Sequence, residues 1–363
     1  MKRIKYRNLK KKMKLNSKLK KLFNDFLNSG QYLPGPAINK FEKTISNYCG
    51  RKYCVGMSSG TSSLYLALKV LNIGKGDEVI CPAISWIASA SAIAMTGAKP
   101  VFVDVKLDQT ISTNHIIEAI NNKTKAIMMV HFTGVIADYI NINKIAKLHS
   151  LFIIEDAAQA FGAKLYNKFA GNLGDISAFS FNPMKVLKGY GEAGAVLTNS
   201  SKLFIELKRK RHLGMDIANS EKCTSLELNS KIDELQCYFL LQSLKELKKE
   251  IKIRKNIIKN YISELKNYTI YCDYNLNNSS GYDYQILISN RNKLKKYLQD
   301  KNIETKIKHP ILIPNQPIFK KMKRYKLSTA ELICNNSLSL PLHRYLSDSD
   351  QNYIISTIKK FIN

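Results

Sequence analysis

Paired cysteines and a long apolar run are missing from this sequence of 363 residues. The seven cysteines are scattered, with no CxxC pair and no regular spacing, at Cys49, Cys54, Cys81, Cys223, Cys237, Cys272 and Cys334. This spacing argues against a disulfide framework and a cysteine-based metal site, and it is typical of reduced thiols in the cytosol. We therefore expect a cytoplasmic protein that uses no metal ion.

The basic amino terminus lacks the apolar stretch and the small-residue cleavage site of a secretory signal. Residues 79–98 carry no charge, but Pro82, Gly97 and several serines interrupt them. A membrane-spanning helix needs about 20 predominantly apolar residues. We therefore predict a buried strand followed by a buried helix in this region, and no membrane segment.

Acidic residues are scarce, because 28 Asp and Glu stand against 57 Lys and Arg and give a formal net charge of +29. Such an excess is common in nucleic-acid binders. Here, however, lysine accompanies asparagine and isoleucine throughout the chain, and in residues 246–268 the lysines occupy the polar side of a helical pattern. We therefore do not expect nucleic acid as a partner, whereas a small anionic substrate suits the charge.

Internal repeats and linkers rich in proline, glycine or serine are absent as well. Short β-branched runs alternate instead with segments of helical spacing. The runs cover residues 53–59, 77–83, 99–105, 125–132, 151–158, 176–181 and 194–199, and the helical segments cover 61–74, 85–97, 113–122 and 139–150. This alternation predicts an α/β fold with a mainly parallel central sheet covered by helices.

The pattern changes after about Asn229, where a long helix is predicted from Lys231 to about Leu265, followed by a mixed α+β tail. We therefore expect two domains. The large α/β domain, which includes the amino-terminal segment, covers residues 1–245, and a smaller α+β domain covers residues 246–363.

Ligands of open parallel sheets bind at the carboxyl ends of the strands, so the turns there carry the functional information. In the first turn, Gly60 precedes Thr61, Ser62 and Ser63 at a helix start. Backbone N–H groups and hydroxyls at such a place bind phosphate, although an ordinary Ser/Thr helix cap gives the same pattern. The second turn holds Trp86, the only tryptophan, which could stack on a planar ligand; taken alone, it fits a core position better.

In the third turn an apolar strand runs into Asp156, with Gln159 three residues later. A buried carboxylate is costly unless it is paired, and a cationic ring nitrogen would pair it, although a helix cap is an alternative. The fourth turn places Lys185 five residues after Ser180. A lysine in a water-poor pocket becomes an amine nucleophile that can form a Schiff base, whereas most loop lysines are merely solvated. In this order, the four turns indicate a pyridoxal phosphate site.

Along nearly its whole length the sequence resembles the nucleotide-sugar aminotransferases of the DegT/DnrJ family. The resemblance lies in the segments at residues 27–68, 76–93, 96–105, 155–163, 174–185, 190–199, 228–236 and 338–343. It implies the type I fold of pyridoxal phosphate-dependent transferases. It also implies a ping-pong reaction in which an amino acid, typically glutamate, leaves its nitrogen on the cofactor as pyridoxamine phosphate. That amine then passes to a nucleotide-linked keto sugar and gives an amino sugar for glycan or metabolite synthesis.

The family also implies roles for individual residues. Lys185 forms the Schiff base and moves the proton, Asp156 holds the ring nitrogen protonated, Gln159 binds the ring hydroxyl, and Trp86 stacks on the ring. The phosphate ligands are Gly60, Thr61, Ser62 and Ser180. Asn229 reaches the phosphate of a neighbouring subunit, which implies a homodimer with shared active sites.

Other family positions concern the sugar nucleotide. Lys231 and Arg211 are candidates for its diphosphate, although both could be surface cations. Lys308 and His309 stand where relatives often carry histidine and tyrosine, in a segment that faces this substrate. The segment 229–236 is most similar to members that aminate C3 of a keto hexose.

Three alternatives exist on the same scaffold. Sugar dehydratases replace the lysine with histidine, so Lys185 argues against that reaction. A desulfurase would need a reactive cysteine in a mobile loop, and no such motif is evident. A regulatory or nucleic-acid-binding protein without transaminase activity stays open as an alternative.

Overall fold

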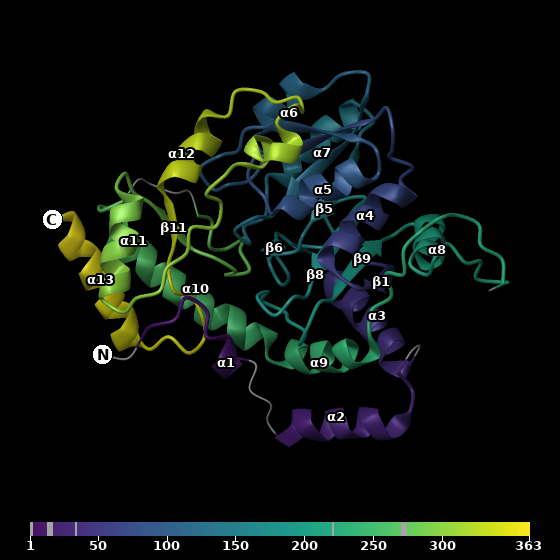
Figure 1. Ribbon diagram of the computed structural model, residues 1–363, viewed down its shortest axis with the longest axis horizontal. Helices are drawn as coiled ribbons and strands as arrows, with labels where there is room; N and C mark the ends of the chain where they lie inside the picture. Colours follow the sequence, from purple (N-terminus) through teal and green to yellow (C-terminus); the bar gives the residue numbers. More distant parts are fainter. Residues whose placement is uncertain (1–2, 13–16, 33–34, 220, 270–273) are drawn as a thin grey trace.

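The computed structural model describes residues 3–12, 17–32, 35–219, 221–269 and 274–363, and Figure 1 shows their arrangement. A seven-stranded sheet forms the centre of the larger part, in the order β1-β9-β8-β5-β4-β2-β3. Its strands are β1 (Tyr53–Met57), β2 (Glu78–Pro82), β3 (Lys99–Val103), β4 (Thr124–Val130), β5 (Phe152–Asp156), β8 (Ile176–Ser180) and β9 (Gly194–Thr198). Each of the seven predicted runs forms one of these strands, which confirms the predicted α/β class.

The sheet is parallel except for β9, which runs antiparallel to both β1 and β8. No crossover helix separates β8 from β9, so the chain returns beside the strand it has just left. The connecting loop, residues 181–193, therefore starts and ends at one edge of the sheet. That edge carries the carboxyl ends of the parallel strands, and the loop contains Lys185.

Helices cover both faces of the sheet because successive strand residues point to opposite sides. In β4, Ile127 and Met129 belong to one core cluster and Met128 and Val130 to the other. The helices of the larger part are α2 (Ser17–Ser29), α3 (Pro36–Cys49), α4 (Gly60–Val70), α5 (Ile87–Met95), α6 (Thr113–Ala119), α7 (Tyr139–Leu148), α8 (Ser201–Lys210) and α9 (Glu234–Lys245). The short strands β6 (Lys164–Leu165) and β7 (Lys168–Phe169) form a separate hairpin.

The carboxyl-terminal part has a core cluster of its own around a two-stranded sheet. Its elements are α10 (Leu247–Leu265), β10 (Gln285–Leu287), α11 (Arg291–Asp300), the 3₁₀ turns Ile313–Asn315 and Pro317–Phe319, α12 (Ser328–Asn336), β11 (Ser337–Ser339) and α13 (Asp348–Ile362). The division at residues 245 and 246 stays a prediction.

The long helix that we predicted from Lys231 to Leu265 is two helices, which meet at Glu246. The packing partners explain the break: α9 packs on α3 beside the large sheet, whereas α10 packs on α13 in the carboxyl-terminal part. One straight helix could not follow both surfaces. Lys231 lies outside the helix and pairs with Met57 at the end of β1.

The amino-terminal segment, which we placed with the large domain, contacts the carboxyl-terminal part. Ile4 forms a parallel bridge with Ile303 and belongs to the carboxyl-terminal core cluster. The short helix α1 (Leu9–Lys12) follows, and Figure 1 shows this purple segment beside α10 and the yellow carboxyl-terminal elements. This packing was not predicted from the sequence, because the segment is rich in basic residues and only alternate residues in it are apolar.

No helix in the described residues is long and apolar enough to cross a membrane. Residues 79–98 instead form buried β2 and the largely buried helix α5, as predicted. The cysteines of the described residues are free thiols, and Cys272 lies outside the described residues.

Candidate active site

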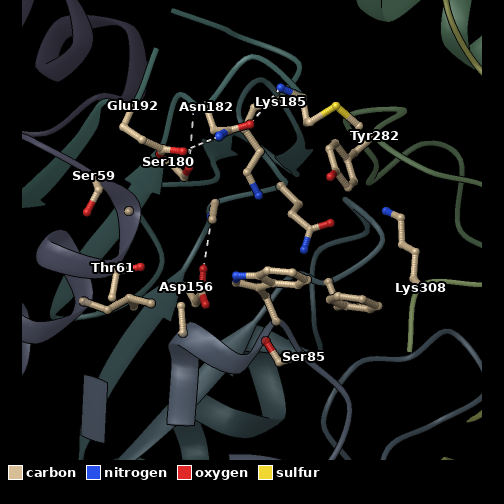
Figure 2. A pocket seen from close by; sticks show the side chains of 18 of the residues that line it. Ser59, Thr61, Ser85, Asp156, Ser180, Asn182, Lys185, Glu192, Tyr282 and Lys308 are labelled. Atoms are coloured by element: carbon tan, nitrogen blue, oxygen red, sulfur yellow. Dashed lines mark hydrogen bonds between the residues drawn. The ribbon is translucent and has the colours of Figure 1, made fainter. Parts of the chain in front are cut away.

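A cavity of about 450 Å³ lies at the carboxyl end of the sheet, and residues from both parts of the chain line it. Figure 2 shows the side chains that converge there. Of the residues predicted from sequence, the lining includes Gly60, Thr61, Trp86, Asp156, Gln159, Ser180, Lys185, Lys308 and His309. Residues more than 200 positions apart in the sequence therefore share one pocket.

The turn between β1 and α4 presents the start of a helix to the pocket. Ser59 caps α4: its hydroxyl accepts a hydrogen bond from the Ser62 N–H at 3.1 Å, and Ser62 Oγ accepts one from the Ser59 N–H at 3.0 Å. Gly60 allows β8 to approach closely, because a Cβ there would lie 2.6 Å from Ser180 Cβ. The pocket is lined by Ser59, Gly60 and Thr61, whereas the Ser62 side chain closes the cap and is absent from the lining. Free N–H groups at a helix start favour an anion such as phosphate.

Trp86 is the N-cap residue of α5 and its side chain is 61% exposed, so it is a pocket residue and not part of the core. The turn taken alone favoured a core position for Trp86, and that prediction was wrong. The strand ends at Pro82, and the chain then turns outward before it reaches Trp86. Trp86 and Asp156 line the same pocket. An aromatic ring in this position can cover a planar ligand.

Asp156 ends β5 and is buried at the floor of the pocket. Its Oδ2 accepts a hydrogen bond of 2.7 Å from Ser89, and Ser89 in turn lies 2.7 Å from the hydroxyl of Ser85. Its Oδ1 accepts from the Ala158 N–H at 3.2 Å. The carboxylate is thus held in one orientation and is not a helix cap, because a turn follows β5. Sequence reasoning missed the two serines, which carry no signal beyond their place beside Trp86.

Gln159 has a buried Oε1 with no hydrogen-bond partner among the described residues. A buried amide oxygen without a donor is destabilising, so it indicates a bound group that supplies one. The close approach at Gly60, the oriented carboxylate of Asp156 and this amide oxygen together fit the phosphate, the ring nitrogen and the ring hydroxyl of pyridoxal phosphate.

Lys185 lies in the loop between β8 and β9. Its backbone N–H donates to the Asn182 carbonyl at 2.9 Å, and Asn182 also hydrogen-bonds Glu192 across the loop. In Figure 2 the Lys185 side chain enters the pocket above Asp156, and its ammonium lies 5.4 Å from the ring centre of Tyr282. The lysine therefore faces the oriented carboxylate from the opposite side of the cavity.

The far wall comes from the carboxyl-terminal part and from the amino terminus. Tyr282 and Tyr6 line it, and sequence reasoning missed both because their neighbours form no recognisable motif. Burial alone would raise the pKa of Tyr282, but the charges of Lys308, Lys185 and Arg7 outweigh burial and lower this pKa to about 8. Burial also lowers the pKa of His309 to about 3, so His309 is neutral at physiological pH.

Besides Ser62, three predicted residues lie outside the pocket lining. Asn229 is exposed, and Lys231 is beside it at the end of β1. Arg211 instead pairs with Glu42 at 2.6 Å and donates to the Gly56 carbonyl, so it is engaged within its own chain. A single chain therefore does not bring these residues to its own pocket.

Known proteins share the sequence pattern and the fold of this chain. The profile of the DegT/DnrJ/EryC1/StrS aminotransferase family matches residues 14–359. Among curated proteins, the chain is similar to UDP-2-acetamido-2-deoxy-3-oxo-D-glucuronate aminotransferase of Pseudomonas aeruginosa, with 33% identity over 92% of each chain. It is also 33% identical, over 96% of each chain, to dTDP-3-amino-3,6-dideoxy-alpha-D-galactopyranose transaminase of Aneurinibacillus thermoaerophilus.

A crystal structure of S. venezuelae DesV in complex with a ketimine intermediate superposes on the chain with a TM-score of 0.95. It shares 30% sequence identity, and the match covers 100% of this chain and 99% of that one. The similarity therefore extends over both parts of the chain.

Proposed function

The chain belongs to the DegT/DnrJ/EryC1/StrS aminotransferase family, and from this premise we propose that it transfers an amino group from glutamate to a nucleotide-linked keto sugar. The cofactor is pyridoxal phosphate, which supplies an electron sink and carries the amino group as pyridoxamine phosphate. The proposal rests on one observation: Lys185 and Asp156 face each other across a single cavity, beside the start of α4.

The residues of the chain fit the parts of this cofactor in a definite orientation. The helix start at Gly60 and Thr61, together with Ser180, would hold the phosphate. Asp156, fixed by Ser89, would hold a proton on the ring nitrogen, because a buried carboxylate favours a cationic partner. Trp86 would cover one face of the ring, which excludes water from that side.

Lys185 moves the proton. Its ammonium enters from the loop, and the hydrogen bonds of Asn182 keep that loop folded back on the sheet. A single flexible amine that reaches the donor carbon and the acceptor carbon in turn can take a proton from one and deliver it to the other. Both half-reactions therefore depend on the same side chain.

We propose glutamate as the amino donor and a 3-keto hexose as the acceptor. The resemblance of residues 229–236 to members that act at C3 supports the second choice, as do the names of the two curated relatives, which describe a 3-oxo and a 3-amino sugar. The product would serve the synthesis of a glycan or a glycosylated metabolite in the cytoplasm.

We further propose a homodimer with shared active sites. Asn229 is exposed and lies outside the pocket of its own chain, so it is available to a second copy. Lys231 beside it would then meet the diphosphate of the substrate in the partner's pocket. We do not propose binding of nucleic acid, because a lysine and an aspartate placed in this way are needed for catalysis and not for a regulatory role.

The first experiment is the visible spectrum of the purified protein with pyridoxal phosphate, before and after glutamate. A yellow protein that bleaches on addition of glutamate, and whose borohydride-labelled peptide contains Lys185, is the expected result. A colourless protein that takes up no cofactor would contradict the proposal. Salt-dependent binding to DNA would then become the relevant measurement.

A further inference from the structure

The wall of the pocket formed by Tyr282, Lys308 and His309 lies far from the phosphate turn. In Figure 2, Ser59 and Thr61 stand on one side of the cavity and Lys308 on the other. An anion at Lys308 is therefore not the cofactor phosphate. The ammonium of Lys308 lines the cavity 4.2 Å from the ring centre of Tyr282 and 5.9 Å from that of Phe132.

Behind this wall the buried carboxylate of Asp283 lies close to two cations, Lys308 and Arg7. Asp283 is fully buried, and its Oδ2 lies 3.2 Å from Lys308 Nζ, while its Oδ1 lies 3.6 Å from Arg7 Nη2. Its oxygens also accept hydrogen bonds of 2.9 Å from Tyr6, Gln285 and Ser339. The acceptor capacity of Asp283 is thus filled, and the cluster retains one positive charge in excess.

No second carboxylate compensates this excess within the described part of the chain. Asp283 is the only acid there within 4.0 Å of the basic groups of Lys308 and Arg7. The buried carboxylate of Glu250 already faces two other cations, Arg254 at 2.8 Å and Arg344 at 3.8 Å. The lowered pKa of Tyr282 agrees with this excess of positive charge. Burial would raise that pKa, but Lys308, Lys185 and Arg7 stabilise the phenolate and lower it.

A buried charge is costly unless a counter-ion accompanies it, and here the open side of the charge is the cavity. One negative charge would balance the cluster, which matches a carboxylate better than a doubly charged phosphate. We propose that Lys308, backed by Asp283 and Arg7, is a subsite for a carboxylate of the substrate. The inference rests on the proposed function, because either substrate could supply this group: the amino acid donor, or a sugar with an acidic substituent.

The test measures binding to the holoenzyme and needs no turnover. Trp86 is the only tryptophan and lines the same pocket, so its fluorescence reports occupancy. The probes are glutarate, which has two carboxylates and no amine, and UDP-glucuronate compared with UDP-glucose. The variant Lys308→Met removes the ammonium at similar length. It leaves Arg7 and Asp283 as a balanced pair, so folding is expected to persist.

In Lys308→Met we expect the affinity for the carboxylate probe to fall by about ten- to one-hundredfold, as for a lost charged hydrogen bond. Lys308→Arg should retain most of the affinity. The matched control is Lys320→Met, at an exposed lysine of the same part of the chain that lies outside the pocket lining; it should change the affinity by no more than about threefold because an exposed charge is screened.

The probes distinguish the two possible sources of the carboxylate, the amino donor and the sugar. A loss confined to glutarate assigns the subsite to the amino donor. A loss confined to UDP-glucuronate, with UDP-glucose unchanged, assigns it to an acidic sugar. Equal binding of every probe by wild type and Lys308→Met, or no binding of any carboxylate by wild type, overturns the proposal. Bleaching by glutamate tests the proposed function separately, and it can succeed while the subsite fails.

Discussion

Replacement of Glu155 by glutamine should destabilise the fold by about 3 kcal/mol at neutral pH, although Glu155 does not line the pocket. This residue is fully buried in β5, one position before Asp156. Burial by itself would raise its pKa, but hydrogen bonds from His131, Ser177 and the Gly171 N–H outweigh burial and lower the pKa to about 2. A pKa lowered from 4.5 to about 2 corresponds to about 3 kcal/mol, because one pKa unit equals about 1.4 kcal/mol.

The geometry explains why the amide cannot replace the carboxylate. Oε1 accepts from the Gly171 N–H at 2.7 Å and faces His131 Nε2 at 3.0 Å, while Oε2 accepts from the Ser177 hydroxyl at 2.6 Å. Oε2 also accepts from the N–H groups of Leu173 and Gly174. Glutamine would turn an N–H₂ group toward one of these sets of donors, which leaves buried donors unsatisfied.

The assay is thermal or urea unfolding of wild type and Glu155→Gln between pH 7 and pH 3. Because the pKa of Glu155 is lower in the folded state, its contribution is present above the unfolded pKa and is lost as the pH falls from about 4.5 towards 2. The difference between the two proteins should therefore shrink as the pH falls. Glu118→Gln is the control, since Glu118 is exposed. A Glu155→Gln protein within 1 kcal/mol of wild type at pH 7, with an unchanged pH slope, would refute the reasoning.

Three further predictions concern the site. Asp156→Asn should slow bleaching by glutamate at least about a hundredfold, because the amide cannot hold a cationic ring nitrogen; a rate near that of wild type in stopped-flow absorbance would contradict this role. Lys185→Met and Asn229→Ala should each be nearly inactive, yet a mixture of the two should regain activity if dimers share sites; full activity of Asn229→Ala in a monomer would exclude sharing. Ultraviolet titration should show a tyrosinate that forms near pH 8 and is absent in Tyr282→Phe. In Lys308→Met its titration midpoint should move to higher pH, because a cation that lowers the pKa of Tyr282 is removed. An unchanged midpoint in Lys308→Met would show that Lys308 does not influence Tyr282.

The sheet and the turns at its carboxyl edge were predictable because their signals are local. Each strand is a run of apolar residues, and each site turn follows such a run directly, so Gly60, Asp156 and Lys185 could be placed at one edge from the sequence alone. The family and the fold were likewise predictable from motifs in order.

The far wall of the pocket could not be predicted in this way. Tyr6 and Asp283 are separated by 277 positions, and neither stands in a pattern that points to the other. The break between α9 and α10 was hidden for a related reason: helical periodicity continues through Glu246, and only the different packing surfaces of the two helices end the first one. Local patterns therefore predicted the wall formed by the strand-end turns, whereas on the far wall only Lys308 and His309 were expected, and these came from the family resemblance.

The long separation between Tyr6 and Asp283 also has a consequence during protein synthesis. Ile4, Tyr6 and Arg7 leave the ribosome early, but their partners Asp283, Ile303 and Leu342 are made some 280 to 335 residues later. At roughly 5–20 residues per second the first segment waits from about 14 seconds to about a minute without its binding surface. A nascent chain stalled before residue 283 would carry the whole phosphate turn and Lys185 but no closed pocket. Such a chain could meet the cofactor before it could discriminate among sugars.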